Sequence, residues 1–208
     1  MDSYRVPARD ATAEIEVKRS RFCCRIARVE SEEAARAVIA EQRRTYGTAG
    51  HHCSGFILGP EATTTRSNDD GEPSGTAGPP ILDALRGADL SDVVAVVTRW
   101  FGGTLLGTGG LVQAYGDAVR TTLRLAGTQR RELRQRLETT VDFAVAGRLE
   151  DQLRRVAGTV EVDYDAGLPT LRLTSGAAQL AEITAMLMTA TGGSAKIHAL
   201  PPVWVDLP

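Results

Sequence analysis

The chain has 208 residues, of which 42% are hydrophobic and 24% are charged, values typical of a soluble globular protein with one or two domains. The formal net charge of −2 excludes a chain that is basic overall, so any nucleic-acid contact must come from a local patch. The chain start lacks the apolar core of a signal peptide, and no stretch is long enough to span a membrane. We therefore expect a cytoplasmic protein with no membrane contact, and an odd count of three cysteines fits that reducing compartment.

The first sixty residues predict two strands, a helix and a third strand, over residues 12–17, 22–29, 31–44 and 53–58. The two leading apolar runs are expected to form a hairpin around residues 18–21. Ser31 followed by Glu32 and Glu33 is typical of a helix N-terminus, because Ser caps free N–H groups and acidic side chains favour the first turn.

Residues 60–80 are polar and rich in Gly and Pro, and they predict a long loop before a short helix at 81–85. Within the loop, Asp69, Asp70 and Glu72 place three carboxylates in four residues. Such a cluster could supply two or three oxygen ligands to a divalent cation. A tight acidic turn, with carboxylates that accept bonds from nearby N–H groups, accounts for the same residues, and we predict this turn and no metal site.

The most informative segment is residues 93–126, which predict a buried strand, a loop with five glycines and a helix. This arrangement directs free N–H groups and the positive end of a helix dipole at one point, which suits an anion such as phosphate. Neither common nucleotide fingerprint is complete, since Thr108 replaces the P-loop lysine and Val112 replaces the third glycine of the dinucleotide motif. The glycines could equally serve tight turns and close helix–strand packing.

Two side-chain pairs beside these loops allow more than one interpretation. Arg99 and Trp100 could contact phosphate and stack on a base, or Arg99 could form an ion pair with one aromatic ring buried. His51 and His52 precede Cys53 at a strand start, where neighbours face opposite ways. Zinc would need further ligands and a Cys–His nucleophile pair has no supporting motif, so we expect one histidine to be buried or hydrogen-bonded and the other to line a groove.

Residues 128–135 are charged and lack apolar periodicity, so we place a joint between domains there. The remaining segments follow the order β-α-β-β-α-β, the split β-α-β plan of ferredoxin-like folds. We therefore predict two domains, residues 1–130 and residues 135–208. Residues 1–134 carry 18 basic and 17 acidic side chains, and residues 135–208 carry 6 and 9, so neither part is a basic arm.

Several segments together resemble the bacterial YigZ/Impact family. The matching pieces are residues 18–22 (KRSRF), 51–53 (HHC), 69–78 (DDGEPSGTAG), 99–103 (RWFGG) and 106–112 (LGTGGLV). The resemblance implies an α+β protein: a two-layer α/β sandwich similar to a small-subunit ribosomal protein domain and to elongation factor G domain IV, followed by a ferredoxin-like domain similar to the last domain of that factor. Eukaryotic Impact proteins regulate translation through a protein partner and carry a different second module, so that partner is not implied for this chain.

On this basis we expect a non-enzymatic, translation-linked regulatory protein that binds RNA, the ribosome or a ribosome-bound protein through a groove in the first domain. Two alternatives stay open: an enzyme or sensor for a small phosphorylated ligand such as a nucleotide, with Mg²⁺ on the acidic loop, and a protein-interaction regulator of stress signalling. No catalytic constellation and no cofactor motif is evident. The candidate ligand-binding residues are His51, His52, Asp69, Asp70, Gly71, Glu72, Gly78, Arg99, Trp100, Gly102, Gly103, Gly107, Thr108, Gly109 and Gly110.

Overall fold

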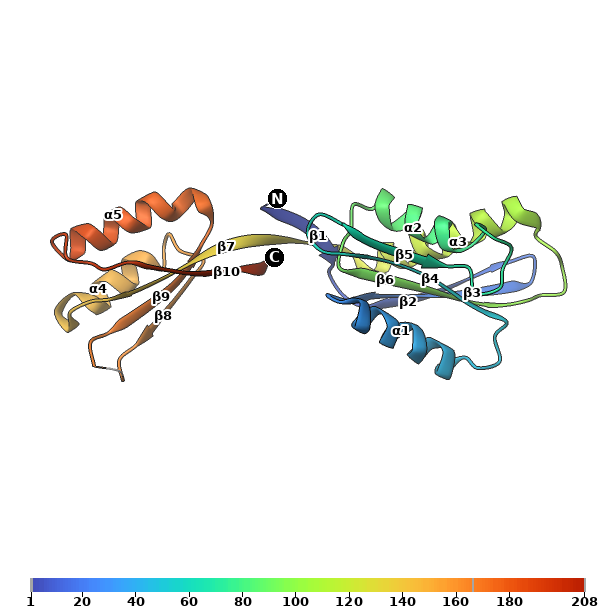
Figure 1. The fold of residues 1–208 in the computed structure, drawn as a ribbon, viewed down its shortest axis with the longest axis horizontal. Coiled ribbons are helices and arrows are strands. Elements are labelled where there is room, and N and C mark those ends of the chain that lie inside the picture. Colours follow the sequence, from blue (N-terminus) through green and yellow to red (C-terminus); the bar gives the residue numbers. More distant parts are fainter. Residues whose placement is uncertain (1, 166, 208) are drawn as a thin grey trace. The chain divides into compact units, whose positions relative to one another are not determined.

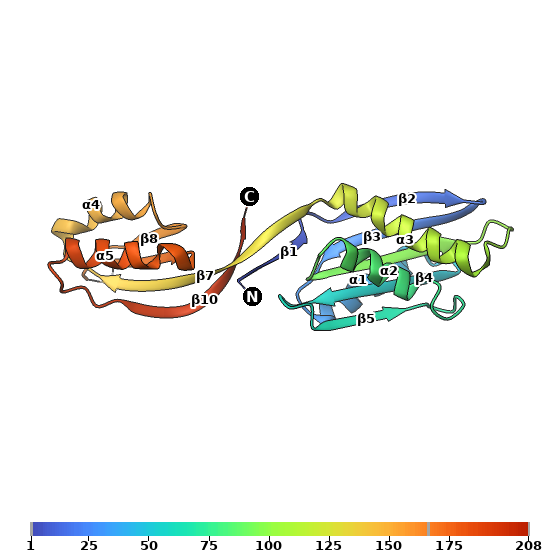
Figure 2. The same cartoon turned by 90° about the horizontal axis from the view of Figure 1, so that it is seen from above.

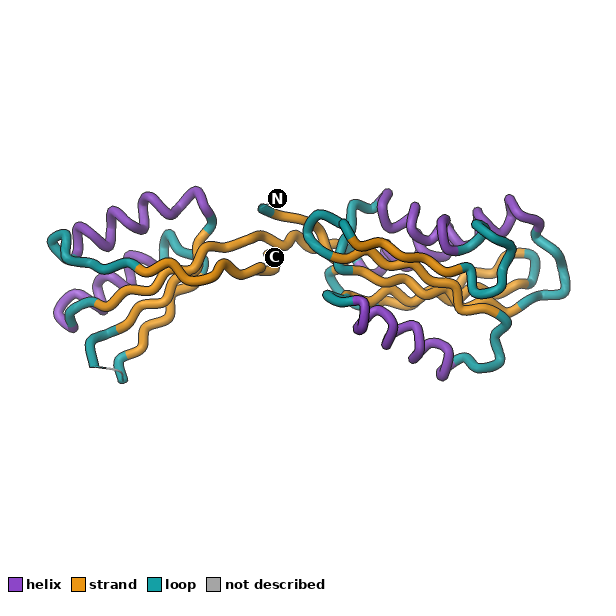
Figure 3. The backbone as a smooth tube through the Cα atoms, in the orientation of Figure 1, coloured by secondary structure: helices purple, strands orange, loops and turns teal. Residues whose placement is uncertain are grey.

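A computed structural model describes residues 2–165 and 167–207. The chain divides between Arg130 and Arg131 into two compact units, the first built from residues 3–130 and the second from residues 131–207. Figure 1 labels the elements of each unit, Figure 2 shows them from above, and Figure 3 colours them by secondary structure.

The first unit is a five-stranded antiparallel sheet with helices on both faces (Figure 1). Its elements in chain order are β1 (Ser3–Pro7), β2 (Ala11–Val17), β3 (Ser20–Arg28), α1 (Glu32–Thr45), β4 (His51–Leu58), β5 (Thr64–Asn68), α2 (Gly78–Gly87), β6 (Val93–Trp100) and α3 (Gly107–Ala126). The strand order in the sheet is β2-β3-β6-β4-β5.

Strand β6 lies at the centre of this sheet and is buried on both faces, which explains its run of β-branched residues. One core lies between the sheet and helices α2 and α3, where the edge of the Phe22 ring meets Tyr115. A second core, with Val94 and Val96 of β6, lies between the sheet and α1. The predicted α+β class is confirmed, and α1 adds a helical layer on the face opposite α2 and α3.

Short sequence signals set the turns as predicted. Lys18 and Arg19 join β2 to β3 with φ values of 47° and 66°, the left-handed conformation that a two-residue hairpin turn requires at both positions. The Ser31 side chain accepts a hydrogen bond from the Ala34 N–H at 3.1 Å and caps α1. Gly127 ends α3 with φ 64°, as a C-terminal glycine does.

The prediction of one long loop over residues 60–80 is wrong at both ends. Strand β5 pairs with β4 along the sheet edge, and its polar side chains carry no apolar alternation that would reveal it. Helix α2 begins at Gly78, three residues before the predicted start, because Pro79 and Pro80 occupy the first turn, where the missing N–H costs nothing.

The second unit has the ferredoxin-like order of elements and strands, with β10 beside β7 and the sheet running β10-β7-β9-β8. Its elements are β7 (Thr128–Thr140), α4 (Phe143–Leu153), β8 (Thr159–Asp163), β9 (Thr170–Ser175), a short 3₁₀ turn (Ala177–Gln179), α5 (Leu180–Ala190) and β10 (His198–Leu207). Helices α4 and α5 cover one face (Figure 2), and the core between helices and sheet includes Leu149, Leu171 and Ile183.

The charged segment 128–135, where we placed the joint between domains, contains the division between the two units and forms the first part of strand β7. The segment escaped detection because most residues of β7 are half-buried and no apolar face stands out. The final strand, β10, continues through two prolines to Leu207.

Candidate functional site

The predicted site residues gather at the end of the first unit's sheet, where β6 leads into the glycine loop. The antiparallel register places Phe22 of β3 and His51 of β4 on either side of Arg99. The loop of residues 69–77, between β5 and α2, contacts this end of the sheet through Glu72.

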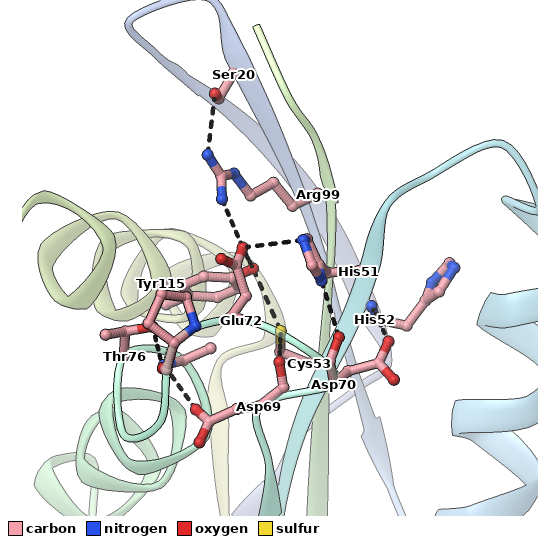
Figure 4. A network of polar contacts seen from close by, with 12 residues as sticks. Ser20, His51, His52, Cys53, Asp69, Asp70, Glu72, Thr76, Arg99 and Tyr115 are labelled. Carbon is pink, nitrogen blue, oxygen red and sulfur yellow. Dashed lines mark hydrogen bonds and ion pairs between the residues drawn. The ribbon is translucent and has the colours of Figure 1, made fainter. Parts of the chain in front are cut away.

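Glu72 is the centre of a buried polar network (Figure 4). Its Oε1 accepts a hydrogen bond from Arg99 Nη1 at 2.6 Å and another from the Tyr115 hydroxyl at 2.7 Å. His51 Nε2 lies 3.9 Å from the same oxygen. Glu72 is 8% exposed and Arg99 is 6% exposed, so the two form a buried ion pair. Each charge compensates the other for the loss of contact with water.

The Arg99 guanidinium lies between two aromatic rings, 5.4 Å from the Phe22 centroid and 5.8 Å from the Phe101 centroid. Its Nη2 donates to Ser20 Oγ at 3.5 Å, and the Gly102 N–H donates to the same hydroxyl at 3.1 Å. Arg99 is therefore not placed to contact a phosphate, because Glu72 neutralises the charge of the guanidinium and the Arg99 side chain is buried. Of the two interpretations, the ion pair describes this residue.

Asp69 organises the acidic loop through backbone hydrogen bonds. Its Oδ1 accepts from the N–H groups of Ala77 and Gly78 at 2.9 and 2.8 Å, and its Oδ2 accepts from Gly75 at 2.8 Å. Burial, the largest influence, raises the pKa of Asp69, but these three hydrogen bonds outweigh it and hold the pKa below its ordinary value of 3.8. Asp69 thereby fixes the loop and the first turn of α2, as the acidic-turn interpretation expected.

Asp70 and the two histidines form a second set of contacts. Asp70 Oδ2 accepts the His52 backbone N–H at 2.6 Å, and its Oδ1 forms an ion pair with Arg43. Burial raises the pKa of Asp70, but the hydrogen bonds from Arg43 and from the His52 backbone lower it by more. The pKa of Asp70 therefore lies below its ordinary value of 3.8. His51 Nδ1 lies 2.8 Å from the Asp70 carbonyl oxygen, which only accepts, so Nδ1 carries the proton and Nε2 faces Glu72.

The Cys53 thiol is enclosed by this network and is chemically quiet. Its sulfur lies 3.0 Å from the Asp69 carbonyl oxygen and 3.3 Å from the Tyr115 hydroxyl. Burial raises the pKa of Cys53 to about 12, so the group stays a protonated thiol rather than a nucleophilic thiolate.

The glycines of the loop after β6 serve different purposes. A Cβ on Gly102 would lie 2.1 Å from the Arg19 carbonyl carbon, so this glycine allows the loop to pass against the hairpin turn. Gly103 and Gly107 have φ values of 81° and 75°, which favour glycine. Gly109 has no atom within 4 Å of such a Cβ and lies in open space, so its role is not packing.

Helix α3 begins at this loop without a capping side chain. Leu106 occupies the N-cap position and makes no side-chain capping bond, and Gly110 packs only against Leu106. Thr108 and Gly109 in the first turn are exposed. The first-turn N–H groups of a helix have no intrahelical partners, so those of this twenty-residue helix are open to a ligand.

The loop before this helix contacts a basic hairpin turn and carries an exposed aromatic side chain. Lys18 and Arg19 are exposed at the hairpin turn, and Arg19 Nη2 donates to Thr104 Oγ1 at 2.9 Å. Phe101 is 59% exposed and Leu105 is 83% exposed. Residues 18, 19 and 101–109 together are called the glycine-loop surface below.

Trp100 and His52 lie on the face of the sheet opposite Arg99 and His51. The candidate residues therefore do not all line one groove. Strand alternation turns Trp100 away from Arg99, and its ring packs edge-on against Tyr46 at 5.4 Å with Arg21 4.8 Å from its centroid. His52 is 6% exposed on that face, and burial lowers its pKa, which keeps the ring neutral.

The two remaining predicted glycines have structural roles in the acidic loop. Gly71 has φ 84° and lies beside the His51 ring, and a Cβ on Gly78 would lie 3.0 Å from the Asn68 nitrogen. Sequence reasoning missed Tyr115, although its position on the apolar stripe of the helix after the loop predicts an inward-facing ring. Trp100, which we expected to stack on a base, packs against Tyr46, whereas its neighbour Phe101 is 59% exposed.

The fold and site define a class of protein with two α+β units, in which a buried polar network borders an exposed glycine loop. Residues 18–123 match the Impact N-terminal domain family. Over 203 residues the chain is 36% identical to the IMPACT family member YigZ of Escherichia coli (strain K12), covering 96% of this chain and 99% of that protein. The chain therefore belongs to the Impact family.

Two further similarities agree with this membership. The chain is 42% identical to the IMPACT family member YvyE of Bacillus subtilis (strain 168) over 141 residues, which cover 68% of this chain and 65% of that protein. A solved structure titled only as that of an hypothetical protein aligns with 97% of this chain and 98% of its own, at a TM-score of 0.66 and 36% identity. Among the described residues, no helix is long and apolar enough to cross a membrane.

Proposed function

We propose that this Impact-family chain is a translation-linked regulator that binds RNA, on its own or on the ribosome, through the glycine-loop surface. The observation that carries the proposal is the exposed, uncapped start of α3, preceded by a loop that contacts a basic hairpin turn and carries an exposed aromatic ring. An unpaired nucleotide offers a phosphate, which suits free N–H groups, and a base, which suits an aromatic face.

Each part of this surface has one role in the proposal. The first-turn N–H groups of α3 donate hydrogen bonds to a phosphate oxygen, and Lys18 and Arg19 add positive charge beside it. Phe101 provides the stacking platform in place of Trp100, which lies on the opposite face of the sheet. The Glu72–Arg99 pair underneath holds the loop and the Phe101 ring in position and takes no part in binding.

A cytoplasmic location and the absence of catalysis belong to the same proposal. The three cysteines are free thiols, which suits a reducing compartment. The alternative of a phosphorylated small ligand with Mg²⁺ has less support, because Asp69 already accepts three backbone N–H groups and Asp70 is paired with Arg43. A nucleotide that competes for the same surface would revive it.

The sharpest test places a negative charge at the helix start. Thr108→Glu should leave the protein as stable as before or slightly more so, because a carboxylate interacts favourably with a helix N-terminus. The same carboxylate should repel phosphate and weaken binding to an unstructured fluorescent RNA about tenfold or more in an anisotropy titration. Gln113→Glu makes the same charge change at an exposed position further along α3 and serves as the matched control.

A salt series distinguishes this surface from non-specific adhesion. Binding should weaken as salt rises, with a shallow slope because only a few basic residues flank the site. Sedimentation with ribosomes over the same salt range should show co-migration at low salt that Thr108→Glu reduces. Binding that ignores both salt and Thr108→Glu would refute the proposal.

A further inference from the structure

The second unit contains a groove that the glycine-loop proposal does not use and that lies outside the matched Impact N-terminal domain. The groove has a volume of about 670 Å³ and lies between α4 and α5. Figure 2 shows these two helices side by side over one face of the sheet. Its apolar lining consists of Val145, Leu149, Val156, Ala185, Met186 and Ala190.

The lining residues follow helical spacing on both walls. On the α4 side they are residues 145, 148, 149, 152, 155 and 156, and on α5 they are residues 182, 185, 186, 189 and 190. From 145 to 153, where α4 ends, this stripe extends about 12 Å at 1.5 Å per residue, and residues 155 and 156 continue it in the turn after the helix. A trough of this length with a stripe on each wall has the shape that receives a third helix.

Helix α5 is unusually apolar for a helix at the surface. Glu182 is its only charged residue, while Ala185 and Thr189 are exposed and Met188 is 38% exposed. A surface helix ordinarily carries charged side chains opposite its buried stripe. The groove floor is continuous with the core, since Val145 and Met186 also pack against the buried residues of this unit.

The charges at the groove rim point to the partner's chemistry. Arg148 and Arg155 line the α4 side, are exposed, and form no ion pair in the part of the chain that the structure describes. Arg148 lies in α4, and Arg155 lies seven residues further along the chain, in the turn that follows the helix. Residues 135–208 are acidic overall, with 6 basic and 9 acidic side chains, so this positive rim is a local exception. Glu182 stands on the opposite wall.

We propose that the α4–α5 groove binds an amphipathic α-helix of a partner protein. The apolar stripe of that helix packs between Val145 and Met186, which are both partly exposed. Carboxylates seven residues apart on one edge pair with Arg148 and Arg155, and a basic residue on the other edge faces Glu182. This inference is independent of the RNA proposal, because it concerns different residues in a different unit.

The test uses two designed helical probes of about 18 residues, acetylated, amidated and labelled with fluorescein. Both carry leucines at helical spacing, and they differ only in having Glu or Lys at two edge positions seven residues apart. Fluorescence anisotropy with the full chain should show the Glu probe binding roughly tenfold more tightly than the Lys probe. In the double variant Arg148→Glu, Arg155→Glu, this preference should reverse.

Control variants keep the test specific to the groove. Lys196→Glu changes an exposed charge in the same unit away from the lining and should leave the preference unchanged. Ala185→Glu places a charge on the exposed part of the groove wall and should abolish binding of both probes, with an unaltered thermal unfolding curve showing that the fold survives.

Three results with the designed probes would overturn the proposal: no binding of the Glu probe up to about 1 mM, a preference that the arginine reversal does not change, or binding that Ala185→Glu does not affect. If the chain itself is a dimer that Ala185→Glu converts to a monomer, the groove belongs to a second copy and the partner-helix proposal fails.

Discussion

Glu72→Gln should destabilise the first unit severely, because it removes the only charged partner that the structure gives the buried Arg99 guanidinium. The Gln side chain has nearly the same shape and can still accept one hydrogen bond from Tyr115. The substitution therefore removes charge and leaves packing almost intact. It isolates the electrostatic part of the network in Figure 4.

The magnitude follows from the geometry of the pair. Two unit charges whose centres are about 4 Å apart attract by about 4 kcal/mol at an effective dielectric constant of 20. Removal of one partner of a buried pair typically costs about 3–5 kcal/mol, because the other charge stays desolvated. A small domain is stable by only about 5–15 kcal/mol, so the loss is a large part of the total.

Urea unfolding followed by circular dichroism measures this effect. With a slope of about 2 kcal/mol per molar urea, the midpoint should fall by roughly 2 M. The double variant Glu72→Gln, Arg99→Met should recover part of that loss, since no unpaired charge remains. Glu14→Gln, in the exposed pair with Arg21, is the matched control and should cost less than about 1 kcal/mol. A Glu72→Gln midpoint within error of this control would refute the buried-pair argument.

Three further predictions follow from the same geometry. Gly102→Ala should lower the free energy of unfolding by about 3 kcal/mol or more, because the added Cβ would meet the Arg19 backbone. Gly109→Ala, in open space on the helix, should raise the free energy of unfolding by up to about 1 kcal/mol. Equal urea midpoints for the two variants would contradict this. Burial holds the pKa of His52 below 6.5, so the contribution of the neutral ring to stability is present above pH 6.5 and is lost as the pH falls below that value. The urea midpoint of the protein should therefore decrease between pH 7.5 and 5.5, and His52→Asn should reduce that decrease. Phe101→Ala should leave stability nearly unchanged, since the ring is 59% exposed, and should weaken RNA binding about tenfold by anisotropy; unchanged affinity would remove its stacking role.

Much of the fold could be predicted because local sequence patterns favour the same elements that the tertiary structure contains. The β-branched run of β6 predicted a strand buried on both faces, and Ser31 marked the start of α1. The order of elements in the second unit predicted its ferredoxin-like plan. Strand β5 and the first part of β7 were missed because their side chains are polar or half-buried on both faces, so pairing with neighbouring strands, rather than apolar burial, defines them.

The candidate site was predicted less completely, because its arrangement depends on contacts distant in sequence. The sequence placed Glu72 in an acidic turn and Arg99 beside a loop, but their pairing joins residues 27 positions apart. Alternation along β6 also decides that Arg99 and Phe101 share one face and that Trp100 lies on the other. A strand assignment that extended to Trp100, followed by a strict alternation of faces, would have separated Arg99 from Trp100.

The most direct test of RNA binding at the glycine-loop surface is photochemical cross-linking. The full chain would be irradiated with single-stranded RNA that contains 4-thiouridine, and the cross-linked residues would be identified by mass spectrometry. The account predicts cross-links at Phe101 and within residues 18–19 and 102–109, and their loss in Thr108→Glu. Cross-links confined to the Trp100 face or to the second unit would contradict it.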